Sequence, residues 1–155
     1  MLAINDENLS LSHFTKLICL SMAFISFTAS SAAPKIDDMP IRLAKGHVST
    51  TIKGKLNPEQ NEHWYQFSAA SGQFAVINIA PRDDTPEVAN VGILYLPDGQ
   101  HDGSKGGIIY QGCLPVSGRY RLRIARNLMA TQGGAAGYLT EIIILPKYAS
   151  QTLCK

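Results

Sequence analysis

The sequence predicts an all-β fold, a single antiparallel β-sandwich of about seven to eight strands. Three observations support this prediction. No segment after residue 33 shows a sustained hydrophobic period of 3.6 residues, so long amphipathic helices are not expected. Short runs rich in β-branched and aromatic residues recur instead between residues 48 and 145. Gly, Pro, Asn and Asp break these runs at the spacing typical of sandwiches and barrels.

Seven strands are expected, each a run of β-favouring residues that ends at a turn signal. In chain order they are 48–56, 63–68, 74–80, 91–96, 108–114, 120–126 and 138–145. The turn signals are Ser71–Gly72, Asp98–Gly99, Asp102–Gly103, Gly106–Gly107 and Ser117–Gly118, with Pro97 and Pro115 at strand exits. The connections 81–90 and 127–137 are longer than a hairpin needs, and ordered loops of this kind often carry function.

Alternation within the runs indicates which side chains face the core. Tyr65 and Phe67 share one face of their strand, because successive side chains point to opposite sides. In the next strand the core face is expected to be that of Ala75, Ile77 and Ile79.

The run 119–126 shows the clearest alternation. Its inward set is Tyr120, Leu122 and Ile124. Its outward set is Arg119, Arg121 and Arg123, which together form a cationic ladder on one face of one strand.

Residues 1–33 are predicted to be a secretory signal peptide, and residues 34–155 one β-sandwich domain. Lys16 precedes an apolar run at 17–27, which gives way to small residues at 28–33, the order typical of such signals. The run is shorter than the ~20 residues that span a bilayer. We therefore expect export to the periplasm, with a retained N-terminal anchor as the alternative.

Composition and charge do not favour nucleic acid as a partner. Of the 155 residues, 45% are hydrophobic and 17% charged, and the formal net charge is +2. Removal of the signal raises the net charge only to about +3, and no run of basic residues is longer than two.

Two cysteines remain in the predicted domain, Cys113 and Cys154. An exported chain with one pair of cysteines can form one disulfide, which would close a loop of about forty residues and stabilise the fold by ~4 kcal/mol. The alternative is two free thiols.

No catalytic or metal-binding constellation is evident. His47, His63 and His101 have no spacing that aims two imidazoles at one metal, and no Gly-x-Ser-x-Gly elbow is present. Residues 98–103 resemble the start of a calcium loop, but the position for its bidentate Glu is Ile109, so a hairpin turn is expected. The acids Asp83, Asp84 and Glu87 fit a solvated turn. We therefore expect a protein that is not an enzyme and needs no cofactor or metal.

Four segments carry a family resemblance: KGHVS at 45–49, IKGKL at 52–56, YQFSAASGQ at 65–73 and LPVSGRYRLRI at 114–124. In this order they resemble the bacterial periplasmic inhibitors of g-type lysozyme. The related inhibitors of i-type lysozyme share the Ser-Gly-x-Tyr element. The resemblance implies a β-sandwich that binds lysozyme, with the g-type favoured.

The Ser-Gly-x-Tyr turn is the predicted binding site. A lysozyme cleft carries acidic groups, so an inhibitor is expected to present hydrogen-bond donors and positive charge on a rigid turn. The candidate partner-binding residues are Ser117, Gly118, Arg119, Tyr120, Arg121 and Arg123. Tyr120 is expected to anchor the turn against the core, with direct contact to the enzyme as the alternative. A purely structural β-turn at Ser117–Gly118 is the other interpretation.

A second family, the pre-peptidase C-terminal domains, is also similar, above all at LYLPDG, residues 94–99. It implies a binding module for a saccharide, a peptide or an envelope partner. An export signal followed by one domain favours the inhibitor interpretation. An exposed strand edge would also allow a homodimer.

Overall fold

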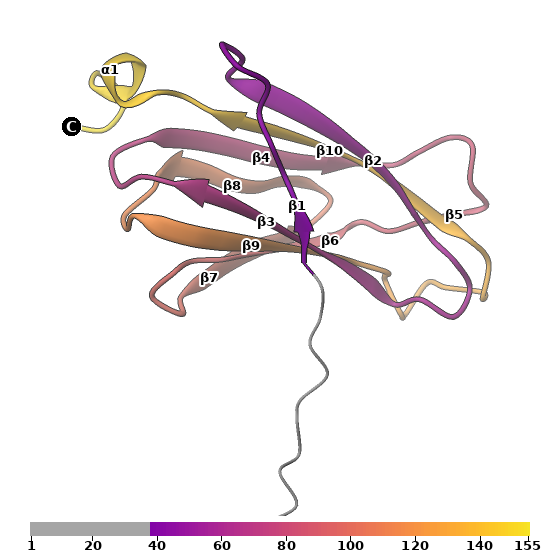
Figure 1. Cartoon of the computed structure of the whole chain (residues 1–155). Coiled ribbons are helices and arrows are strands. Elements are labelled where there is room, and N and C mark those ends of the chain that lie inside the picture. The colour runs from indigo at the N-terminus through magenta and orange to yellow at the C-terminus, as the bar shows by residue number, and fades with distance from the viewer. Residues whose placement is uncertain (1–37) are drawn as a thin grey trace, which may run out of the picture. The chain divides into compact units, whose positions relative to one another are not determined.

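Two β-sheets form the fold that the computed structural model describes for residues 38–155 (Figure 1). The predicted signal peptide, 1–33, lies outside these residues. The first sheet has the order β1–β3–β9–β6–β7, with β1 Met39–Pro40, β3 Glu62–Ala69, β9 Gly118–Ala125, β6 Val91–Tyr95 and β7 His101–Lys105. The second has the order β2–β10–β4–β8, with β2 Ser49–Leu56, β10 Ala136–Ile144, β4 Phe74–Ala80 and β8 Gly107–Cys113. The predicted all-β sandwich is confirmed.

Two short elements complete the described chain. β5, Glu87–Val88, pairs with β10, and a four-residue helix α1, Lys147–Ser150, follows β10. The pairs β1–β3 and β5–β10 are parallel, so the sheets are mostly but not wholly antiparallel. In residues 38–155 no helix has the length and apolar character needed to cross a membrane.

All seven predicted strands are present, with ends that differ by one or two residues at most. The prediction of a turn at Asp102–Gly103 is wrong, because both residues lie inside β7. Gly103 faces Ile93 of β6, and a Cβ on it would lie 2.7 Å from the Gly92 carbonyl oxygen. The close approach of the two backbones explains the glycine.

The predicted core faces are confirmed. Alternate side chains of β3, β4 and β9 meet between the sheets, each less than a tenth exposed. These residues are Tyr65, Phe67, Ala75, Ile77, Ile79, Tyr120, Leu122 and Ile124.

A buried tyrosine links the two sheets. The Tyr138 hydroxyl lies 2.5 Å from the Tyr65 hydroxyl and 2.6 Å from Nδ1 of His63. Burial raises the pKa of Tyr138 and lowers that of His63. Gly54 of β2 makes room for this ring, since a Cβ there would lie 2.1 Å from Tyr138 Cζ.

Candidate functional site

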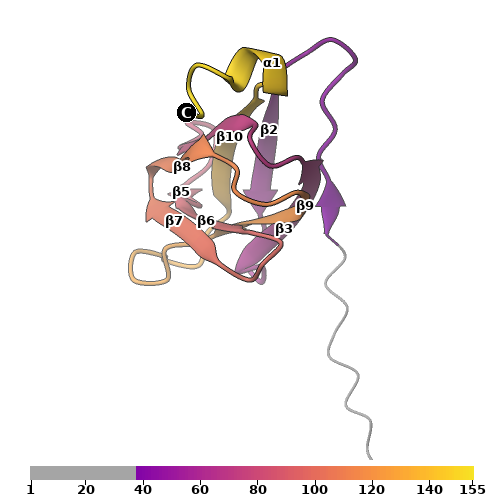
Figure 2. The same ribbon diagram turned by 90° about the vertical axis from the view of Figure 1, so that its left-hand side faces the viewer.

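One end of the sandwich carries the predicted turn, and Figure 2 looks onto it. The turns 70–73, 96–100 and 114–118 meet there, beside the loop 41–48 and helix α1. We call this region the Ser117 end.

Hydrogen bonds from the neighbouring turn fix the Ser117 turn. The Ser71 amide donates to Ser117 Oγ at 2.9 Å, and the Ser71 hydroxyl donates to the Pro115 carbonyl at 2.8 Å. The Gly72 amide donates to the Leu114 carbonyl at 2.9 Å. The Ser117 side chain is exposed, and its hydroxyl keeps its own proton for a further acceptor.

Gly118 is required by geometry. Its φ is +152°, and a Cβ would lie 2.9 Å from Cβ and Cγ of Pro97. A side chain at residue 118 would therefore push the Ser117 turn away from the turn 96–100. The close packing of the two turns thus explains the glycine of the Ser-Gly-x-Tyr element. Ser117 itself stays exposed.

Tyr120 anchors the turn, as predicted. Its side chain has no exposed surface, its hydroxyl donates to the Val116 carbonyl at 2.5 Å, and its ring stacks on Phe67 with centroids 5.4 Å apart. Burial raises the pKa of the phenol. The buried Tyr120 therefore holds the turn that carries Ser117 and Arg119.

Replacement of Tyr120 by phenylalanine is expected to cost about 1 kcal/mol of unfolding free energy, because the Val116 carbonyl loses its donor. Urea denaturation measures this. Tyr148→Phe is the matched control, because that side chain is 80% exposed, and it should unfold like the wild type. An unchanged midpoint for Tyr120→Phe would count against the anchoring role.

The disulfide Cys113–Cys154 is present, as predicted. It ties the segment after α1 to the end of β8, directly before the Ser117 turn. The same segment is also held by Ser150, which is fully buried and accepts the Phe74 amide at 2.9 Å. The Ser117 end is therefore braced by one covalent bond and several hydrogen bonds.

The cationic ladder lies on the outer face of its sheet, but two of its three charges are paired. Arg121 makes a bidentate contact with Asp38, at 2.5 and 2.9 Å. Arg123 contacts Glu62 at 2.5 Å. The hydrogen bonds to Asp38 raise the pKa of Arg121.

These two arginines also hold an aromatic ring. The Arg121 guanidinium carbon lies 4.3 Å from the Trp64 ring centroid, and Trp64 Nε1 donates to Glu62 at 2.7 Å. Arg121 and Arg123 thus have local partners that the sequence pattern did not show.

Arg119 differs from the other two. It is exposed, and it makes no ion pair with any residue between 38 and 155. With Arg42 and Ser68 it lines a hollow of ≈ 200 Å³ beside the Ser117 turn. Its charge is the one in the ladder that is open to a partner.

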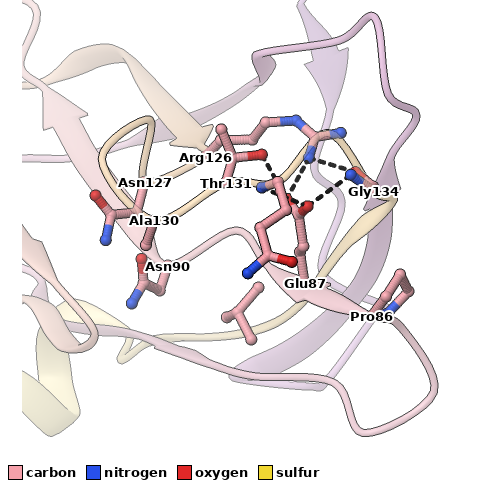
Figure 3. Close-up of a pocket in the computed structure, with 10 residues that line it drawn as sticks. Pro86, Glu87, Asn90, Arg126, Asn127, Ala130, Thr131 and Gly134 are labelled. Carbon is pink, nitrogen blue, oxygen red and sulfur yellow. Dashed lines mark hydrogen bonds and ion pairs between the residues drawn. The ribbon is translucent and has the colours of Figure 1, made fainter.

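A pocket of ≈ 500 Å³, drawn in Figure 3, is lined by residues of β5 and of the segment 126–134, at the end of the sandwich opposite the Ser117 turn. Glu87 lines it, and the prediction that this acid belongs to a solvated turn is wrong. Its carboxylate accepts the amides of Gln132 and Gly134, the Thr131 hydroxyl and Arg126 Nη1. The Thr131 hydrogen bond, followed by that of the Gly134 amide, lowers the pKa of Glu87.

The hydrogen-bonding groups of Arg126 are also fully used. Besides Glu87, its guanidinium donates to four carbonyl oxygens, at 2.5–3.1 Å. These belong to Leu56, Asn57, Gln60 and Gly134. Because all N–H groups of Arg126 are used, neither member of the pair is free to bind a ligand, and we assign the cluster a structural role.

These features describe a β-sandwich in which a rigid scaffold presents a braced basic turn. Several solved structures have a similar fold. The chain is similar to PliG of Aeromonas hydrophila, described as a periplasmic inhibitor of g-type lysozyme, with 21% identity and a TM-score of 0.55, covering 70% of this chain and 96% of that one.

Two further structures of the same description are similar. PliG of Salmonella Typhimurium has 21% identity and a TM-score of 0.53, and a PliG mutant from Escherichia coli has 22% and 0.53; each match covers 70% of this chain and 97% of the other. No family model and no curated protein matches the sequence. The chain therefore has the fold of these inhibitors, in agreement with the resemblance of its motifs.

Proposed function

We propose that this protein is an exported, periplasmic inhibitor of lysozyme that acts without catalysis, with the g-type favoured as target and the i-type as the second candidate. The observation that carries the proposal is the Ser117 turn, which exposes Ser117 and Arg119 while the buried Tyr120 holds it in place. Rigid presentation reduces the entropy lost on binding. The fold shared with PliG supports the same conclusion.

The proposed mechanism is occlusion of the enzyme's cleft. The Arg119 guanidinium pairs with a cleft carboxylate, and the Ser117 hydroxyl donates to the catalytic acid. Gly118 lies between Ser117 and Arg119 in the chain, so its backbone places both side chains at the same turn. Arg121 and Arg123 lie behind Arg119 and reach a partner only if they exchange their present carboxylates for those of the enzyme.

A lysis assay tests this function. The purified protein is mixed with g-, i- and c-type lysozymes, and the clearing of a peptidoglycan suspension is followed. We expect slower lysis by the g-type or the i-type enzyme. If micromolar protein slows none of the three, the proposal is wrong.

Within this proposal, Arg119→Ala is expected to weaken binding by about 2 kcal/mol, or roughly 30-fold in Kd, because a desolvated charge pair is lost. Titration calorimetry measures it. Lys105→Ala removes the same charge from the far end of β7 and should leave Kd unchanged. Equal affinities of Arg119→Ala and wild type would place the binding site elsewhere.

The alternative of a pre-peptidase-like binding module is supported by residues 94–99. In the structure Leu94 is a core residue and Pro97 packs against Gly118, so this segment has structural uses. The alternative requires binding of a saccharide, a peptide or an envelope partner without slower lysis, and the same assay separates the two.

A further inference from the structure

Exposed apolar side chains gather at the Ser117 end. Tyr148 of α1 is 80% exposed, Leu153 52% and Val48 40%. Tyr148 and Val48 line a pocket of ≈ 340 Å³, together with residues of the loop 41–48. A tyrosine held this far out of the core offers a partner a large contact area.

This pocket shares a lining residue with the hollow beside Arg119. Ser68 lines both the pocket beside Tyr148 and the hollow that Arg119 lines. Ser68 and Arg119 are also register partners in the β3–β9 pair. One surface thus runs from Arg119 across Ser68 to Tyr148.

The two ends of the sandwich differ in charge. The Ser117 end and its flanking segments carry Arg42, Lys45, Arg119, Lys147 and Lys155, with Asp98 as their acidic neighbour. The turn 57–60, the loop 81–86 and β5 lie at the opposite end and carry Glu59, Asp83, Asp84 and Glu87 (Figure 1). Asp84 and Glu87 are paired there with Arg82 and Arg126, so Glu59 and Asp83 are the acids left over in these segments. The Ser117 end therefore complements an acidic partner.

The platform beneath Tyr148 is rigid. Ser150, two residues later, is fully buried and bonded to the Phe74 amide, and the disulfide fixes Cys154 to β8. Tyr148 is therefore presented in a fixed place, as the Ser117 turn is.

We propose that the enzyme docks end-on against the whole Ser117 end, with Tyr148 as a second anchor beside Arg119. The pocket between α1 and the loop 41–48 receives an apolar side chain from the rim of the acidic cleft. This inference rests on the proposed function and adds a contact that the Ser-Gly-x-Tyr element does not contain.

Binding of the lysozyme that the lysis assay identifies is measured by calorimetry for the wild type, Tyr148→Ala and Met129→Ala. Met129 is 96% exposed in the loop 127–135 at the opposite end, so it controls for the loss of an exposed apolar side chain. Tyr148→Ala is expected to raise Kd at least tenfold, with an unchanged melting temperature. Met129→Ala should bind like the wild type.

The outcomes separate the two proposals. If Arg119→Ala weakens binding and Tyr148→Ala does not, the second anchor is wrong and the proposed function stands. If the wild type binds no lysozyme, the proposed function fails and the anchor with it. Sedimentation of the free protein is the third measurement: a dimer that Tyr148→Ala dissociates would assign the patch to a second copy of the chain and overturn the inference.

Discussion

Replacement of Arg126 by leucine is expected to lower the free energy of unfolding by about 3–5 kcal/mol. Only 4% of Arg126 is exposed, so its charge and its N–H groups are met almost entirely by the protein. The variant leaves the half-buried Glu87 without its cation, and four carbonyl oxygens without a donor. Urea denaturation followed by far-UV circular dichroism measures the loss.

Arg119→Leu is the matched control for this prediction. It removes an exposed arginine from β9, the strand that Arg126 directly follows. Surface substitutions of this kind usually change stability by less than about 0.5 kcal/mol. Equal losses in the two variants would show that Arg126 has no special structural role.

The same cluster predicts how stability depends on pH. Hydrogen bonds from Thr131 and Gly134, with the charge of Arg126, hold the pKa of Glu87 below its ordinary value. The unfolded chain therefore binds a proton at higher pH than the folded one does. The stabilisation is complete above the unfolded pKa of about 4.3 and is lost as pH falls through the lower folded pKa. Glu87→Gln should show a shallower loss of stability on acidification than the wild type.

Alternation allowed the sandwich to be predicted because the core side chains of β3, β4 and β9 recur with a period of two. β7 was missed because its sequence, HDGSK, shows no apolar alternation and lies at the edge of its sheet. The partner strand β6 decides its conformation, and no local pattern reports that pairing.

The candidate site was only partly predictable, because pairing between distant segments also decides which of its charges are open. Alternation places Arg119, Arg121 and Arg123 on one face, but it does not show that Asp38 and Glu62 lie beside two of them. Those carboxylates are 83 and 61 residues away in sequence. Tertiary pairing thus reduces a ladder of three charges to one open charge, at the turn.

One signal for the Arg126 cluster was present in the sequence. Arg126 has the same parity as Tyr120, Leu122 and Ile124, and alternation alone therefore places it on the core face. A charge on that face needs a partner. The fold brings Glu87 to it, an acid expected from the sequence to lie in a solvated turn.

The disulfide contributes to the rigidity of the Ser117 end. Cys113 ends β8 just before the turn that leads to Arg119 on β9, and Cys154 follows α1, which carries Tyr148, so the bond joins the two segments next to these residues. Without it, α1 and the residues just before it are held by hydrogen bonds alone, from the Phe74 amide to Ser150 and between Leu145 and residues 73–74.

Replacement of both Cys113 and Cys154 by serine is expected to lower the free energy of unfolding by about 4 kcal/mol, because the unfolded chain regains the freedom of a loop of 41 residues. Denaturant midpoints of the wild type with and without reductant, beside those of the double variant, measure it. Reductant should lower the wild-type midpoint to that of the variant and leave the variant unchanged. If the wild type keeps its midpoint when fully reduced, the cross-link does not stabilise the fold. Under the proposed function, the affinity of the double variant for lysozyme should also fall, because α1 then has to be ordered on binding. The affinity should fall less if the binding site is confined to the Ser117 turn.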